Sequence, residues 1–138
     1  MTSFLQALLH KESTGRPRII NTRNGKVVAD QLLTAFDSES RRTGLLQHQS
    51  LPPSTAMIIA PTNAIHTFFM KFSIDIAFVS KDGCVVKIRP RVPAWRMTGA
   101  MRAYAVLEMA AGALASSDTQ VGDRLAVDLF AGSKPCAE

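Results

Sequence analysis

Residues 65–79 read IHTFFMKFSIDIAFV, and this run says most about the fold and the site. Its apolar, β-branched and aromatic side chains are typical of buried strands. Three polar residues interrupt them, namely His66, Lys71 and Asp75. Buried polar groups destabilise a fold unless they are hydrogen-bonded or paired. The run therefore predicts part of a sheet and also marks the place where a functional site is to be sought.

The sequence around this run predicts neighbouring strands. Residues 74–80 and 84–90 are both strand-like, and they flank Lys81-Asp82-Gly83, a short loop with glycine where a positive φ is needed. We expect these two segments to pair antiparallel. Residues 65–70 are predicted to form a further strand.

Farther out, short strands and turns alternate along most of the chain. Further predicted strands cover residues 18–21 and 26–36, which Asn24-Gly25 joins as a hairpin, and residues 56–60, 103–109 and 124–130. Short helical segments are predicted at residues 4–9, 41–46 and 114–119. Many short strands separated by turn residues are typical of these folds. We therefore expect a mainly β protein, an antiparallel β-sandwich or small barrel with one or two short helices.

Length and composition fit one globular domain, because the 138 residues are 46% hydrophobic and 20% charged. We divide the chain into an N-terminal arm or short helix (1–17), a single β domain (18–131) and a polar C-terminal tail (132–138).

No apolar run is long enough to span a bilayer, and the first ten residues lack the features of a signal peptide, which predicts a cytoplasmic protein. Neither Cys84 nor Cys136 has a C-x-x-C partner, so we expect no disulfide framework, no metal and no other cofactor.

The net charge of +5 is unevenly placed. Residues 81–102 contain six basic residues and one acid, Asp82. Such a region attracts phosphate, nucleic acid or an acidic partner, unless it is simply a solvated basic face. Nucleic-acid binding is not favoured, because the chain has no helix-turn-helix, zinc-finger or RNA-binding aromatic motif.

Several short motifs occur in an order that resembles a known family. They are Arg41-x-x-Gly44-Leu45-Leu46, Met57-Ile58-Ile59, the run from His66 to Phe78, Asp82-Gly83-x-Val85-Val86, Trp95-Arg96, Val106-Leu107-Glu108-x-x-Ala111-Gly112 and Val121-Gly122-Asp123-Arg124. Over roughly residues 18–130 the chain resembles the bacterial and archaeal domain-of-unknown-function family 192. The resemblance implies a compact, mostly antiparallel β domain of sandwich or barrel type with a small helical decoration. It implies no activity, because the family is uncharacterised, and many relatives carry an export or lipoprotein leader that is not visible here.

His66 and Asp75 are the candidate catalytic residues. A histidine among apolar neighbours can be a general base or a metal ligand, or a core imidazole that is bonded to a backbone carbonyl. An aspartate in an apolar strand needs a cation or several hydrogen-bond donors, and it can also act as a general base. Its candidate cations are Lys71, Arg41, Arg91 and Arg96. The sequence leaves open whether Asp75 is catalytic or a member of an internal ion pair.

The pair Trp95-Arg96 lies in a proline-flanked loop and suits stacking on a ring together with an anion contact. The alternative is a tryptophan that covers the end of the domain. Together with Lys71 and Arg91, this pair makes up the predicted ligand-binding residues. Glu108 either pairs with an arginine, Arg102 or Arg124, or completes a polar cluster with His66 and Asp75. Arg41, Glu108 and Asp123 are the predicted structural polar residues.

Three functions are consistent with these residues. The first is a small domain that binds a polar or anionic ligand, such as a sugar, carboxylate or phosphate, in a pocket. The second is a hydrolase- or lyase-type enzyme that uses His66 and Asp75. The third is a protein-interaction module without a small-molecule site, and a homo-oligomer also fits the chain. The common hydrolase, nucleotide-binding and metalloprotease motifs are absent from the sequence.

Overall fold

The computed structural model describes residues 3–9 and 16–130. Residues 1–2 and 10–15 of the predicted arm and the whole predicted tail lie outside the described residues. Within the described part, no helix is long and apolar enough to cross a membrane.

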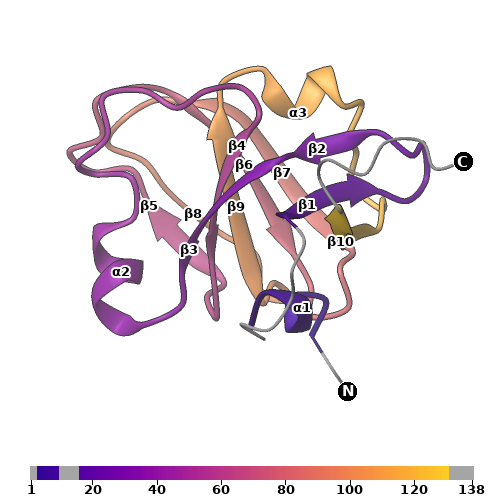
Figure 1. The fold of residues 1–138 in the computed structure, drawn as a ribbon. Helices are drawn as coiled ribbons and strands as arrows, with labels where there is room; N and C mark the ends of the chain where they lie inside the picture. The colour runs from indigo at the N-terminus through magenta and orange to yellow at the C-terminus, as the bar shows by residue number, and fades with distance from the viewer. Residues whose placement is uncertain (1–2, 10–15, 131–138) are drawn as a thin grey trace, which may run out of the picture.

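A five-stranded sheet forms the centre of the molecule (Figure 1), with the strand order β3-β4-β9-β6-β7. β3 runs parallel to β4, and the other neighbours are antiparallel. The strands are β3 (Gln31–Ala35), β4 (Thr55–Ile59), β6 (Ile74–Val79), β7 (Val85–Val92) and β9 (Ala105–Ala110). Every residue of β4 and of β6 is buried. Burial on both faces explains why these strands read as continuous apolar runs rather than as alternating ones.

Different elements cover the two faces of this sheet (Figure 1). The first face packs on a second sheet, β10-β1-β2, and on the short helices α1 and α3. The second face packs on the segment that follows α2 and on β5 of the small sheet β5-β8, while α2 itself has no buried residue. The covering elements are α1 (Gln6–Leu9), β1 (Arg16–Asn21), β2 (Val27–Ala29), α2 (Ser38–Thr43), β5 (Ala64–His66), β8 (Met97–Gly99), α3 (Ala113–Ser116) and β10 (Leu125–Phe130). Each face therefore has its own apolar core.

The expected mainly β fold with short helices is confirmed, and the described strands form several sheets without closing into a barrel. The predicted antiparallel pair at residues 74–80 and 84–90 is confirmed as β6 and β7. The expected strand over residues 65–70 is wrong beyond His66, where β5 ends. The physical reason lies at Phe69, because its φ of 65° is left-handed and incompatible with an extended strand.

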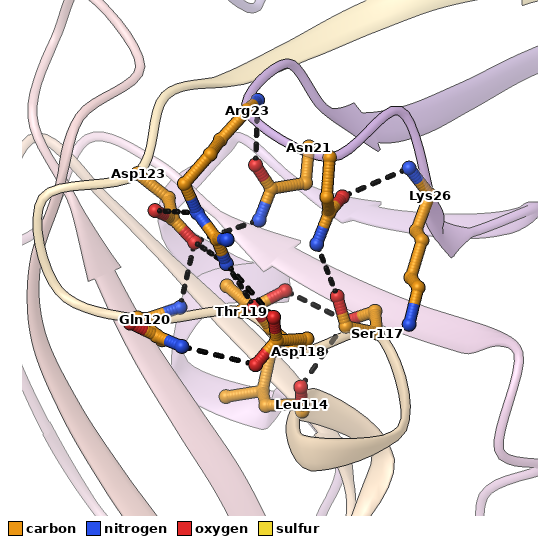
Figure 2. Close-up of polar contacts among 10 residues, drawn as sticks. Asn21, Arg23, Lys26, Leu114, Ser117, Asp118, Thr119, Gln120 and Asp123 are labelled. Atoms are coloured by element: carbon orange, nitrogen blue, oxygen red, sulfur yellow. Dashed lines mark hydrogen bonds and ion pairs between the residues drawn. The ribbon is translucent and has the colours of Figure 1, made fainter.

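A buried polar network holds the turn after β1 against the segment before β10 (Figure 2). The Asp123 carboxylate accepts hydrogen bonds from Asn21 Nδ2 at 2.8 Å, from Arg23 Nε at 2.7 Å and from the Gln120 backbone N–H at 2.8 Å. The hydrogen bond from Arg23, helped by the one from Asn21, lowers the pKa of Asp123 to about 2. Asp123 thus joins segments that lie about 100 residues apart in sequence.

We expect Asp123→Asn to lower the melting temperature at neutral pH. The melting temperature of this variant should also fall less steeply as the pH is lowered. The folded-state pKa of Asp123, about 2, is below its unfolded value, so its stabilisation is present above about pH 4 and is lost as the pH falls towards about 2. Thermal unfolding between pH 7 and pH 2 measures this. The exposed Asp30 supplies the control variant Asp30→Asn, which should follow the wild type. An acid dependence of Asp123→Asn as steep as that of the wild type contradicts the assignment.

Candidate functional site

A cavity of about 300 Å³ lies between α2, β5 and the second face of the central sheet. Its lining includes a buried acid, Glu108. Its polar lining comes from α2, from the segment before β5, from β5 itself and from β9. These residues are Ser38, Arg41, Arg42, Thr43, Thr62, His66 and Glu108.

Glu108 supplies the buried acid at the cavity. It lies between Leu107 and Met109 in β9, whose side chains pack in the core of the first face, so strand alternation turns Glu108 to the second face. Glu108 is only 5% exposed. No hydrogen bond or ion pair to Glu108 occurs within residues 3–9 and 16–130. The Glu108 residue thus lines the cavity without a hydrogen-bond or ion-pair partner from the described chain.

Burial raises the pKa of the Glu108 carboxyl to about 7, and no neighbouring charge offsets this effect. The group is therefore divided between its neutral and ionised forms near neutral pH. In the neutral form it can donate a hydrogen bond, and in the ionised form it can only accept. Gly44 lies next to the carboxyl, since a Cβ at that position would lie 3.9 Å from Glu108 Oε1, which is an ordinary van der Waals contact.

The rim of the cavity is basic because of the way α2 is built. Asp37 caps the helix by accepting a hydrogen bond from the Ser40 backbone N–H at 2.7 Å. Arg41 and Arg42 then fall in the last turn, where cations are favoured by the helix dipole. Arg41 Nη1 donates to the carbonyl oxygen of Phe36 at 2.7 Å, which fixes the guanidinium between helix and sheet. Arg42 is exposed at the cavity.

His66 enters the cavity lining from the end of β5. Its side chain is exposed, so it is not the core imidazole that was one of the two alternatives. Its Nδ1 accepts a hydrogen bond from the Phe68 backbone N–H at 3.3 Å, and its ring stacks on that of Phe68 with centroids 4.8 Å apart. The second nitrogen is left for contacts at the cavity rim.

Comparison with known families agrees with this architecture. The model of the uncharacterised family DUF192, described as "Uncharacterized ACR", matches residues 19–127. The chain belongs to the DUF192 family. A search of curated proteins found no match.

Two solved structures resemble the DUF192 domain described here. A Sinorhizobium meliloti protein described as a "putative transcription regulator" has a TM-score of 0.71 and 21% identity over 82% of this chain and 92% of its own. A Novosphingobium aromaticivorans protein of unknown function has a TM-score of 0.69 and 22% identity over 79% of this chain and 81% of its own. At such identities the likeness shows the fold alone.

Asp75 lies on the other face of the DUF192 sheet from Glu108 and His66. Its carboxylate accepts three backbone hydrogen bonds, from the N–H groups of Arg91 at 3.0 Å, Gly112 at 3.0 Å and Leu114 at 3.1 Å. It forms no ion pair within the described residues, so backbone donors replace the expected cation. The structure therefore does not bring Asp75 and His66 together. Asp75 instead ties β7 and the start of α3 to β6.

The hydrogen bond from the Arg91 backbone N–H to the Asp75 carboxylate explains an irregularity in β7. The pairing of β6 with β7 shifts between Ile74 and Ile76, and Arg91 has a left-handed φ of 49°. A carboxylate that accepts the Arg91 N–H compensates for the lost ladder bond and for the strain. Asp75 therefore holds a β-bulge in place.

The four predicted ligand-binding residues lie outside the Glu108 cavity. Trp95, Arg96 and Lys71 are exposed on the loops that flank β5 and β8. Arg91 and Arg96 line a separate shallow depression beside Pro93. Of the residues singled out from the sequence, the cavity thus brings together Arg41, His66 and Glu108.

Sequence reasoning missed Arg42, Ser38 and Thr62, because exposed polar residues near turns give no signal of their own. Within the described residues, neither Arg102 nor Arg124 forms the ion pair expected with Glu108. Arg124 Nη2 instead lies 3.5 Å from Asp82 Oδ2. The available signal for the site was Glu108 itself, a charged residue within the apolar run of β9. No group of metal-ligating side chains occurs in the part of the chain that the structure describes.

We expect Asp75→Asn to lower the free energy of unfolding by about 3 kcal/mol in the absence of any ligand, because an amide cannot accept all three N–H groups. Urea denaturation at pH 7 measures the change. Asp30→Asn, on an exposed residue, is the control and should change it by less than about 0.5 kcal/mol. An Asp75→Asn domain as stable as the wild type contradicts the structural role.

We expect Glu108→Gln to remove a pH dependence of stability. The folded pKa of Glu108, about 7, is above the unfolded value, so folding takes up a proton between these values and stability falls as the pH rises from about 4.5 to about 7. For the shift from 4.5 to about 7, the loss of stability of the wild type is on the order of 3 kcal/mol. Urea denaturation at several pH values should show a flatter profile for Glu108→Gln, and Glu39→Gln on exposed α2 should leave the profile unchanged.

Proposed function

We propose that this DUF192 domain binds a small polar ligand with an anionic group in the cavity beside α2. One observation carries the proposal, namely the Glu108 carboxyl, which is 5% exposed, faces the cavity and has no partner from the described residues. Burial without a hydrogen-bond donor from the described residues disfavours the ionised form of this carboxyl, and carboxyl groups perturbed in this way are common at functional sites. A ligand that hydrogen-bonds to Glu108 would supply the missing partner.

The surroundings of Glu108 narrow the ligand class. Arg42 and His66 at the rim favour an anionic group such as a carboxylate or phosphate. Glu108 at the inner wall favours a hydroxyl or amine on the same molecule. A volume of about 300 Å³ lies at the lower end of ligand pockets, which favours a small molecule. Hydroxy acids, sugar acids and sugar phosphates combine these features.

The same cavity supports acid–base catalysis as a second candidate function. The pKa of Glu108, about 7, is close to the value at which a general acid or base works best at neutral pH. In this version Glu108 takes the place of Asp75, which lies on the other face of the sheet. A ligand found by binding would then be converted by the wild type and left unchanged by Glu108→Gln.

A thermal-shift screen of hydroxy acids, sugar acids, sugar phosphates and the matching neutral sugars tests the proposal. We expect at least one anionic compound, at about a hundred times its Kd, to raise the melting temperature by about 5–10 °C, and its neutral analogue to have no effect. Glu108→Leu and Arg42→Ala should each abolish the shift.

Glu39→Gln, on the same helix as Arg42 but outside the cavity lining, is the matched control and should keep the full shift. Failure of every compound to stabilise the wild type, or an equal shift in Glu108→Leu, contradicts the proposal.

A further inference from the structure

We propose that a second surface, formed by Phe68, Phe69 and Trp95 with the flanking Lys71 and Arg96, docks the domain onto a lipid bilayer that contains anionic headgroups. We call it the aromatic surface. It lies on the two loops that connect β5 to β6 and β7 to β8. The inference does not rest on the ligand proposed for the Glu108 cavity.

The aromatic surface exposes large apolar side chains that are in contact with one another. Phe69 is 69% exposed and Trp95 is 57% exposed, and Met97 beside them is 75% exposed. The rings of Phe69 and Trp95 meet edge to face with centroids 4.6 Å apart, and the ring of Phe68 lies 5.6 Å from that of Trp95. Isolated exposed apolar residues are ordinary, but a contiguous group marks an interaction site.

The backbone under these rings is strained. Phe69 has a φ of 65° and Trp95 a φ of 68°, a conformation that is costly for bulky residues. Together with Arg91, they are three of the four non-glycine residues with positive φ among the described residues. Neither ring gains burial from this strain. The conformation therefore serves to present the rings rather than to pack them.

Thr67 holds the two loops in this conformation from beneath. It is 1% exposed, and its hydroxyl donates to the Pro93 carbonyl at 2.7 Å and accepts from the Arg96 backbone N–H at 2.9 Å. The Trp95 backbone N–H donates to the Thr67 carbonyl at 3.0 Å. These hydrogen bonds hold the two loops that carry the rings in the absence of a partner.

The charge around the aromatic surface is of one sign. Lys71 and Arg96 are exposed beside the rings, and Arg89 and Arg91 are exposed near Arg96. Residues 60–74 and 83–107 contain no aspartate or glutamate. An occupant that complements the surface must therefore be anionic and must accept apolar rings.

An anionic bilayer fits this combination better than a nucleic acid. Aromatic platforms for single strands leave ring faces free to stack on successive bases, whereas here His66 stacks on Phe68 and Phe69 meets Trp95 with an edge. The rings instead contact one another in a single cluster. Tryptophan and phenylalanine with flanking lysine and arginine are the composition of side chains that anchor proteins at the membrane interface.

Trp95 is the only tryptophan of the chain, so its fluorescence reports on the aromatic surface directly. The test titrates the protein with vesicles of phosphatidylcholine alone, and with vesicles of seven parts phosphatidylcholine to three parts phosphatidylglycerol. We expect a blue shift and co-sedimentation with the anionic vesicles only, and quenching of Trp95 by brominated acyl chains.

Phe69→Gly separates docking from stability. Glycine accepts the positive φ of this position, so the melting temperature should stay the same or rise while vesicle binding falls at least tenfold. Arg96→Gln and Lys71→Gln should each weaken binding to anionic vesicles by about fivefold. Val121→Ser, at an apolar residue that is 60% exposed outside the aromatic surface, is the control and should bind like the wild type.

Three results would overturn the proposal. The first is no blue shift with either kind of vesicle. The second is unchanged vesicle binding by Phe69→Gly. The third is tighter binding of oligodeoxythymidylate than of anionic vesicles, with quenching of Trp95, which would assign the aromatic surface to nucleic acid.

Discussion

The structure depends on the burial of β9 on both faces. This strand is hydrogen-bonded to β4 on one side and to β6 on the other, and its residues enter both apolar cores. Because alternate side chains must fill opposite cores, each position of β9 is committed to one face. Leu107 and Met109 serve the first core, and the same rule forces Glu108 into the second. A charged residue can occupy this strand only where the apolar layer opens, which is at the cavity beside α2.

The local part of this fold could be predicted from the sequence. The antiparallel pair β6 and β7 follows from two apolar runs around a loop that ends in Gly83. The short helix expected at residues 41–46 is present but begins three residues earlier, as α2 (Ser38–Thr43). The parallel pairing of β3 with β4 could not be predicted, because a helix and a long connection separate the two strands and no local signal fixes the pairing. Phe69 was misread for a related reason. Its aromatic, strand-like composition is overruled by a turn that Thr67 holds from the neighbouring loop.

The candidate site was predictable in its residues but not in its grouping. His66, Asp75 and Glu108 each stand out as polar residues in apolar runs, yet only His66 and Glu108 line the same cavity. Asp75 finds its hydrogen-bond donors at Gly112 and Leu114, which lie 37 and 39 residues away. Backbone N–H groups carry no sequence signature, so these donors cannot be predicted from the types of side chain present. The family relation adds no activity to this picture, because the DUF192 family is uncharacterised.

Asp75 and Glu108 show that burial alone does not decide the role of a carboxyl group. Both are nearly inaccessible, with 1% and 5% exposure. Asp75 meets three donors that belong to the fold itself, so it contributes to stability without any further partner. Glu108 meets none among the described residues, and it faces a cavity rather than packed side chains. The fold thus satisfies the first carboxyl internally and leaves the second to be satisfied from outside. The number of internal donors therefore separates a structural acid from a candidate binding group.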